Sequence, residues 1–129
     1  MSAPPSVSIS RIGQVAHTVR DLDAAVTFFR DTLGLQHLFT AGQLAFFDCG
    51  GTRLMVDALP EAQGNGNSVL YFQVDDIAAA AAGLEAKGVE LQAQPHRIHT
   101  YPDGAEERMA FFPDPEGSMF AFMAQRPPA

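Results

Sequence analysis

The sequence predicts an α+β domain that contains two copies of one βαβββ unit. Short segments rich in β-branched and aromatic residues, which are typical of strands, alternate with two segments whose apolar residues recur at helical spacing. The order of one strand, one helix and three strands occurs twice along the chain. The length of 129 residues suits a single domain, which buries roughly two-thirds of the surface of its unfolded chain.

The first unit follows a tail rich in proline and serine, residues 1–10. The apolar segment IGQVAHTV (12–19) predicts a buried strand. Asp21 is expected to cap a helix and Gly34 to end it, because these residue types favour the two helix termini. The apolar stripe of this helix is Leu22, Val26, Phe29 and Leu33. The three strands that complete the unit are expected at 36–40, 44–49 and 52–58.

The second unit repeats this pattern after a loop. The loop, residues 60–67, is rich in turn-forming residues and separates module one (11–59) from module two (67–126). Asp75 or Asp76 is expected to cap the second helix, and Gly88 to end it. The packing stripe of this helix is Ile77, Ala80, Ala81 and Leu84. The strands of module two are expected at 68–74, 89–99, 108–112 and 118–123.

The chain aligned with itself supports a duplication. A shift of 55 residues places VRDLDAA (19–25) on VDDIAAA (74–80), and a shift of 65 places AFF (45–47) on AFF (110–112). The increase in the shift predicts a longer loop in the second copy, at residues 99–107.

The composition argues against several classes of function. Nucleic-acid binding needs clustered Lys and Arg, whereas the formal net charge is −7. No apolar run approaches the ~20 residues of a membrane span, and the N-terminus lacks the pattern of a signal peptide. Cys49 is the only cysteine, so no intrachain disulfide can form, and we interpret it as a small residue at a strand end. We therefore expect a cytoplasmic protein without a nucleic-acid or membrane partner.

Two motifs resemble the vicinal oxygen chelate superfamily of glyoxalases, bleomycin resistance proteins and ring-cleaving dioxygenases. VRDLDAAVTFFRDTLGL (19–35) is similar to the first helix of that family, and FFPDPEGSMFAFM (111–123) to its closing hairpin. The resemblance covers about residues 11–124. It implies two tandem βαβββ modules that form a cupped, partly open mixed sheet, with helices on the convex side and a ligand in the concavity. Members of this length usually pair, so it also implies a homodimer.

The resemblance also indicates where a divalent metal would be held. Many members use one residue from the first strand and one from the last strand of each module, typically His or Gln, Glu, His and Glu. On this sequence the four positions are Gln14, Met55, Val69 and Ala121. Only Gln14 offers a hard donor, whereas zinc needs three or four ligands, and magnesium or calcium needs a larger oxygen shell. We therefore expect no metal at these positions and no cofactor.

Strand alternation and the loop at 99–107 add further candidates. His17 is expected to face the helices, because it lies three residues after Gln14. His96 and His99 point to opposite faces of an extended strand, unless the chain turns at Pro95 or Pro102. The same segment contains Glu106 and Glu107. Asp48 and Asp57 end strands and are expected to be solvated. The candidate ligand pocket comprises Gln14, Met55, Val69, Tyr71, His96, Met119, Ala121 and Met123.

Three functions are compatible with these residues. The favoured one is a protein that binds a small, largely apolar ligand in the concave sheet, without the usual divalent-metal site. The alternative is a metal-dependent lyase, isomerase or dioxygenase-like enzyme with non-standard ligands such as His96, His99 or Glu106. The third is an interaction or structural protein whose cup is filled by its own side chains.

Overall fold

The computed structural model of the chain describes residues 8, 11–63 and 69–128. Most of the predicted tail, 1–10, and residues 64–67 of the predicted linker, 60–67, lie outside the described residues. The elements of module one are β1 (Gln14–Thr18), α1 (Leu22–Thr27), the π-helical turn η1 (Phe28–Thr32), β2 (Gln36–Ala41), β3 (Leu44–Cys49) and β4 (Thr52–Asp57). The 3₁₀ turn η2 (Pro60–Ala62) lies in the predicted linker. The elements of module two are β5 (Leu70–Gln73), α2 (Ile77–Ala86), β6 (Ala93–Thr100), β7 (Glu106–Pro113) and β8 (Met119–Arg126).

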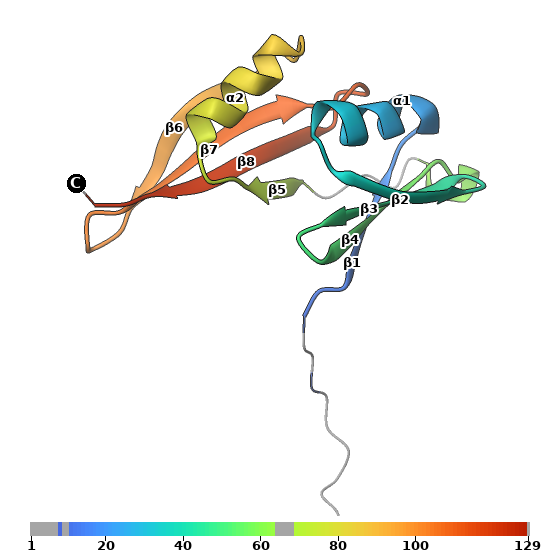
Figure 1. The fold of residues 1–129 in the computed structure, drawn as a ribbon, viewed down its shortest axis with the longest axis horizontal. Coiled ribbons are helices and arrows are strands. Elements are labelled where there is room, and N and C mark those ends of the chain that lie inside the picture. Colours follow the sequence, from blue (N-terminus) through green and yellow to red (C-terminus); the bar gives the residue numbers. More distant parts are fainter. Residues whose placement is uncertain (1–7, 9–10, 64–68, 129) are drawn as a thin grey trace, which may run out of the picture.

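The two modules have the same sheet topology. The strand orders are β1-β4-β3-β2 and β5-β8-β7-β6, and neither four-stranded sheet closes into a barrel. The first strand of each module pairs in parallel with the last, and the remaining neighbours are antiparallel. Both helices lie on the same side of the sheets in Figure 1. The predicted α+β fold with two tandem βαβββ modules is confirmed.

The predicted helix caps are confirmed in both modules. The side chain of Asp21 accepts a hydrogen bond from the backbone N–H of Ala24 at 3.1 Å, and Asp76 accepts one from Ala79 at 3.1 Å. Gly34 follows the first helical segment with φ +76°, a conformation that favours glycine. The structure differs inside that segment, because α1 gives way to a π turn in which the N–H of Leu33 donates to the carbonyl of Phe28 at 2.9 Å.

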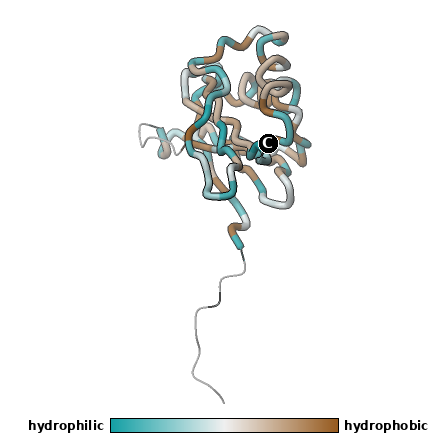
Figure 2. Tube along the Cα trace, turned by 90° about the vertical axis from the view of Figure 1, so that its left-hand side faces the viewer, coloured by the Kyte–Doolittle hydropathy of each residue, from teal (hydrophilic) through white to brown (hydrophobic). Residues whose placement is uncertain are grey.

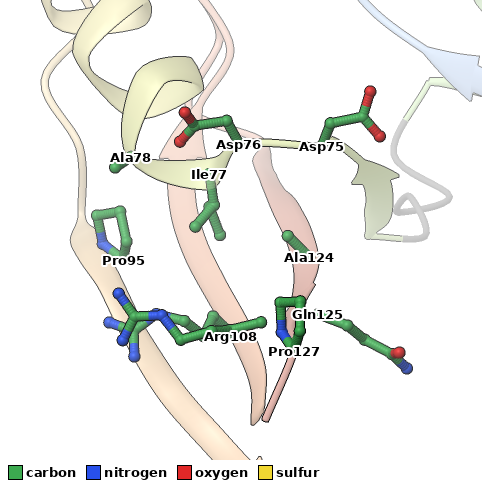
Figure 3. Close-up of a pocket in the computed structure, with 10 residues that line it drawn as sticks. Asp75, Asp76, Ile77, Ala78, Pro95, Arg108, Ala124, Gln125 and Pro127 are labelled. Atoms are coloured by element: carbon green, nitrogen blue, oxygen red, sulfur yellow. The ribbon is translucent and has the colours of Figure 1, made fainter. Parts of the chain in front are cut away.

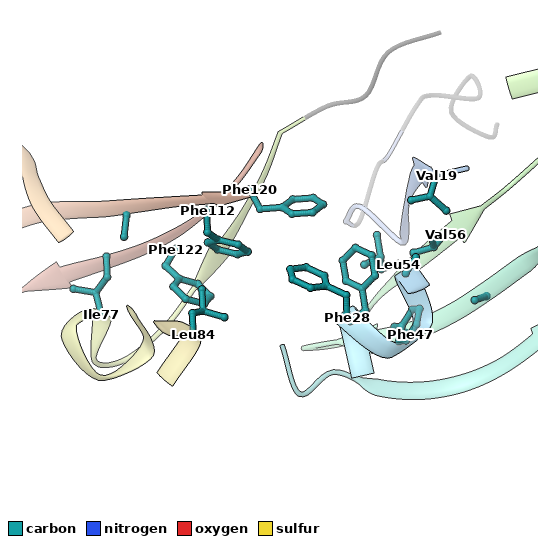
Figure 4. Close-up of a cluster of buried hydrophobic side chains, with 14 of the residues drawn as sticks. Val19, Phe28, Phe47, Leu54, Val56, Ile77, Leu84, Phe112, Phe120 and Phe122 are labelled. Carbon is teal, nitrogen blue, oxygen red and sulfur yellow. The ribbon is translucent and has the colours of Figure 1, made fainter. Parts of the chain in front are cut away.

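One hydrophobic core serves both modules. The two sheets share no ladder, but their helix-facing side chains meet at the module boundary (Figure 4). The rings of Phe29 and Phe120 lie 5.7 Å apart, and those of Phe28 and Phe112 lie 6.5 Å apart. Phe29 and Phe120 are completely buried. Because each module contributes aromatic rings to the same cluster, neither module has a separate core.

A turn of module two docks onto the start of α1 in module one. The carboxylate of Glu116 accepts hydrogen bonds from the backbone N–H groups of Arg20 and Asp21 at 2.8–2.9 Å. Beneath it, the buried Nε2 of His17 lies 3.4 Å from Oδ2 of Asp114. The second oxygen of Asp114 accepts from the N–H of Glu116 and of Ser118. His17 thus faces the helices, as predicted, and links the modules.

The prediction that Asp57 is solvated is wrong. Asp57 is buried, and the hydroxyl of Thr18 on the adjacent parallel strand donates to its carboxylate at 3.1–3.2 Å. The longer loop predicted in the second copy is present with narrower bounds than 99–107: residues 101–105 connect β6 to β7, whereas only residues 42–43 connect β2 to β3. The strands β6 and β7 are also longer than β2 and β3, so the extra residues of the second copy lengthen the whole hairpin.

Hydrophilic and hydrophobic residues are interspersed along the chain in Figure 2. None of the helices in the described part is long and apolar enough to cross a membrane.

Candidate functional site

We call the side of the two sheets opposite the helices the open face. Strand register and alternation place on it, in module one, Gln14, Phe39, Phe46, Arg53 and Met55, and, in module two, Val69, Tyr71, His96, Glu107, Met109, Phe111, Met119, Ala121 and Met123. All eight residues of the predicted pocket are on this face. The next side chains along each strand, such as Val56 and Phe120, belong to the core.

In module one a polar pair lies on an aromatic floor. The guanidinium Nε of Arg53 donates to Oε1 of Gln14 at 2.6 Å, and Nε2 of Gln14 lies 3.8 Å from the sulfur of Met55. The Arg53 guanidinium also lies over the ring of Phe46, at 4.7 Å from its centroid. Phe46 in turn stacks on Phe39 at 4.4 Å. Gln14 and Met55 are therefore in contact, as the candidate pocket requires.

Arg53 is not among the residues predicted for the pocket. It lies two residues before Met55 on the same strand, so alternation alone places it on the open face. Its role is visible only once the parallel pairing of β1 with β4 sets Gln14 opposite Arg53.

In module two the middle of the open face is apolar. Tyr71 pairs with Ala121, which also pairs with Phe111, and the rings of Tyr71 and Phe111 meet edge to face at 6.3 Å. Met123 lies between Gln73 and Met109 in the sheet. Ala121 is fully buried by its neighbours, whereas Tyr71 is 48% exposed. The apolar side chains of β5, β7 and β8 are thus neighbours on this face, and polar residues follow them at Gln73, Glu107 and Gln125.

A hollow opens where the two modules approach each other. It has a volume of about 230 Å³ and is lined by Val15, Cys49 and Arg53 of module one and by Leu70 and Tyr71 of module two, among others. Polar Arg53 and aromatic Tyr71 therefore line a common space. The convergence of Gln14 and Met55 with Val69 and Ala121 stays a prediction.

Two β-bulges change the orientation of the histidines. In β6, His96 pairs with Met109 and His99 pairs with Glu107, with an irregularity between Arg97 and His99. Since residues 107 and 109 point to the same side of β7, both histidines lie on one face. The expectation that three-residue spacing separates them is therefore wrong, because the bulge adds one residue. The ring of His96 lies 6.3 Å from Phe111, and that of His99 lies 4.7 Å from Tyr101.

The two adjacent glutamates of β7 have different surroundings. Glu106 accepts a hydrogen bond from Arg108 at 3.0 Å and lies 3.8 Å from Arg126. Glu107 points to the open face and is 9% exposed, and its Oε2 has no hydrogen-bond partner among the described residues.

A hollow on the helix-covered side lies outside the predicted pocket. It measures about 310 Å³ and is formed by the start of α2 and by strands β6 to β8 (Figure 3). Its charged groups are those of Asp75, Asp76, Arg108 and Arg126. Arg108 already forms an ion pair with Glu106, so its positive charge is not available to a ligand in this hollow.

Cys49, the last residue of β3, is half-buried. Burial raises the pKa of its thiol, and the adjacent carboxylate of Asp48 raises this pKa further. A raised thiol pKa disfavours the thiolate and agrees with a structural residue.

Comparison with known proteins decides the family. Residues 11–122 match the sequence model of the Glyoxalase/Bleomycin resistance protein/Dioxygenase superfamily. The chain belongs to this superfamily. The protein YraH of Bacillus subtilis (strain 168), named as uncharacterized, is 27% identical over 121 residues, which cover 82% of this chain and 91% of YraH. Superfamily membership confirms the resemblance inferred from the two motifs.

Solved structures of the superfamily share the fold. The lactoylglutathione lyase of Agrobacterium tumefaciens aligns with a TM-score of 0.70 and 26% identity, over 90% of this chain and 94% of the lyase. TnmS3, an antibiotic binding protein from Streptomyces sp. CB03234, aligns with a TM-score of 0.78 and 23% identity, over 94% of this chain and all of TnmS3. A protein named as a lyase and one named as an antibiotic binding protein thus have the fold of this chain.

The four superfamily metal positions hold a poor donor set in this chain. Gln14 has the only hard donor, and its Oε1 already accepts from the cationic Arg53. Met55 offers a soft thioether, and neither Val69 nor Ala121 has a donor. The residues present therefore do not fit a divalent ion held in the usual way. Within the described ranges, no group of three or more His, Cys, Asp or Glu side chains is suitably placed for a metal.

Proposed function

We propose that this protein binds a small, largely apolar organic ligand on the open face, without a divalent ion at the four superfamily positions. The observation that carries the proposal is the exposure of large apolar side chains on that face. Phe39 is 47%, Val69 is 44% and Tyr71 is 48% exposed. Exposed apolar side chains on one face favour binding of a partner or ligand, because they are removed from water on contact.

The polar groups support the same proposal. Arg53 and Gln14 stand at one edge of the aromatic surface of module one, and each retains hydrogen-bonding capacity beyond their mutual bond. A few polar groups around an apolar surface are typical of small-molecule sites, because they orient a ligand that hydrophobic contact holds. The description of TnmS3 as an antibiotic binding protein agrees with such a role on this fold.

A neutral fluorescent dye tests the proposal. Nile red is expected to bind the protein, and Phe39→Ala or Tyr71→Ala is expected to weaken binding by about tenfold through loss of apolar contact. Ile98→Ala is the matched control, because Ile98 is 50% exposed, is not among the residues that the strand register places on the open face, and lines none of the hollows described above. The proposal fails if the dye does not bind, or if all three variants bind it equally.

The enzyme alternative makes a different prediction in the same experiment. A metal-dependent lyase, isomerase or dioxygenase-like enzyme would lose thermal stability or ligand binding when EDTA removes its metal. The binding function predicts that EDTA leaves the Nile red titration unchanged. Loss of dye binding with EDTA would therefore favour the enzyme, and His96 and His99 would be the first residues to substitute.

We propose further that the protein is a homodimer. The outer strands of the two sheets are β1 and β2 in module one and β5 and β6 in module two. Such edges have unpaired backbone groups, and pairing between chains would satisfy them.

A further inference from the structure

A second pocket on the open face has a different chemical character from its apolar surroundings. It measures about 260 Å³ and is lined by Gln73, Asp75, Glu107, Met123 and Gln125, together with Val74 and Ala124. Two of its lining side chains are carboxylates and two are amides, and none is Lys or Arg. The pocket therefore offers acceptors and negative charge.

Glu107 is the central group of this pocket. Its side chain is at least nine-tenths buried, and Oε2 has no hydrogen-bond partner among the residues that the structure describes. A buried carboxylate without a donor is costly, because it has lost its hydration without gaining a replacement. Its cation-bearing neighbour Arg108 points to the other face and pairs with Glu106. A group from outside the chain that brings positive charge and N–H donors would remove this cost.

The pocket also lies next to the apolar part of the open face. Glu107, Met109 and Phe111 alternate along β7 on one side, beside Met123 and Ala121 on β8. The four residue steps from Glu107 to Phe111 span roughly 13 Å at about 3.3 Å per residue. An elongated molecule can thus place an aromatic body against Phe111 and Tyr71 while a basic end reaches Glu107.

We propose that the Glu107 pocket binds a protonated nitrogen group, and that the ligand of the open face is an amphiphilic base. This inference rests on the proposed function and adds the charge class of the ligand. A primary or secondary ammonium fits best, because it brings two or three N–H donors to the carboxylate of Glu107 and the nearby amide oxygens of Gln73 and Gln125. A divalent ion fits poorly, since the described residues supply fewer than three suitably grouped ligands.

A matched pair of probes tests the charge. Monodansylcadaverine has an aromatic dansyl group, a five-carbon chain and a terminal primary amine, and its N-acetylated form has the same body without the charge. The chain contains no tryptophan, so dansyl fluorescence is measured without indole emission or energy transfer. The protein is expected to bind the amine at least tenfold more tightly than the acetylated form at pH 7.

Two variants locate the effect. Glu107→Gln retains the shape of the side chain and removes its charge, so it is expected to bind the two probes with equal affinity and the acetylated probe as the parent does. Glu90→Gln changes the net charge equally at an exposed position away from the pocket, and is expected to retain the full preference for the amine. Because Glu107→Gln removes an unpaired buried charge, its melting temperature should not fall below that of the parent.

The outcomes separate this inference from the proposed function. If the parent binds both probes equally, or if Glu107→Gln still prefers the amine, the inference is wrong and binding on the open face stands. If neither probe binds the parent, both the inference and the proposed function are wrong.

Discussion

The guanidinium of Arg53 and the side-chain amide of Gln14 form a hydrogen bond of 2.6 Å across the parallel pair β1 and β4. This bond occupies the only hard donor at the four superfamily metal positions and sets a positive charge beside it. Both features disfavour a cation, because the donor is engaged and like charges repel.

The first prediction concerns metal. EDTA and zinc should each leave the melting temperature of the parent unchanged, because neither removes nor adds a ligand of the folded state. The variant Met55→Glu, Val69→His, Ala121→Glu should be less stable than the parent without metal, since Ala121 is fully buried and a carboxylate there loses its hydration. Zinc should raise its melting temperature. The double variant without the change at Ala121 serves if the triple variant does not fold. A parent that is stabilised by zinc would contradict the prediction.

The second prediction separates folding from binding with one type of substitution. Phe120→Ala should lower the free energy of unfolding by about 3–5 kcal/mol, because a completely buried ring leaves a cavity. Phe39→Ala should cost less than about 1.5 kcal/mol, since that ring is 47% exposed, but it should weaken Nile red binding. Urea denaturation measures the first quantity and a dye titration the second. Equal costs for the two substitutions would contradict the burial that separates them.

The third prediction concerns the junction of the modules. Asp114→Ala should lower the free energy of unfolding by about 2–4 kcal/mol, because two backbone N–H groups and His17 lose a buried partner. Asp103→Ala is the control, as the carboxylate of Asp103 accepts from the N–H of Ala105 in an exposed turn, and it should cost less than about 1 kcal/mol. Urea titrations followed by circular dichroism measure both variants. A cost for Asp114→Ala no larger than that of the control would show that the junction is weak.

The fourth prediction concerns Cys49. Burial and the carboxylate of Asp48 both raise the pKa of its thiol, so alkylation by iodoacetamide should reach its half-maximal rate at a higher pH than free cysteine. Asp48→Asn removes the second cause, and the rate profile should move partly back toward lower pH. Because Cys49 is the only cysteine, mass spectrometry of the intact chain follows the reaction directly. A profile that Asp48→Asn leaves in place would exclude the contribution of Asp48.

The fifth prediction concerns assembly. Light scattering at tens of micromolar protein should give twice the chain mass of 13.8 kDa. A single species with the mass of one chain would contradict the homodimer, and the edges of β1, β2, β5 and β6 would then be exposed in solution.

Local sequence signals predicted most of the fold. The strand at 44–49 was predicted with its exact bounds, and both helix caps were correct, because strand composition and Asp caps act within a few residues. The π turn from Phe28 to Thr32 was not predicted, since the spacing of apolar residues along one helix face is compatible with either hydrogen-bond pattern.

The errors at the candidate site have a common physical origin. Asp57 was expected in solvent, but its partner Thr18 comes from a strand that is distant in sequence. The opposite orientation expected for His96 and His99 assumed a regular strand, and a bulge depends on pairing with β7. The importance of Glu107 depends on which partners it lacks, and only the assembled sheet determines that. The sequence pattern thus does not predict contacts that depend on pairing between strands distant in the sequence.

The contacts between the two modules have a consequence for biosynthesis. His17 and Asp114 are 97 positions apart, and Glu116 reaches back 96 positions to Arg20. Before translation is complete, module one contains Phe28 and Phe29 but lacks Phe112 and Phe120, the rings of module two that pack against them. The nascent amino-terminal half therefore keeps aromatic surface in water until the last hairpin emerges. Contacts between residues so far apart in the sequence slow folding. We therefore expect chaperones to bind the incompletely packed amino-terminal half during synthesis.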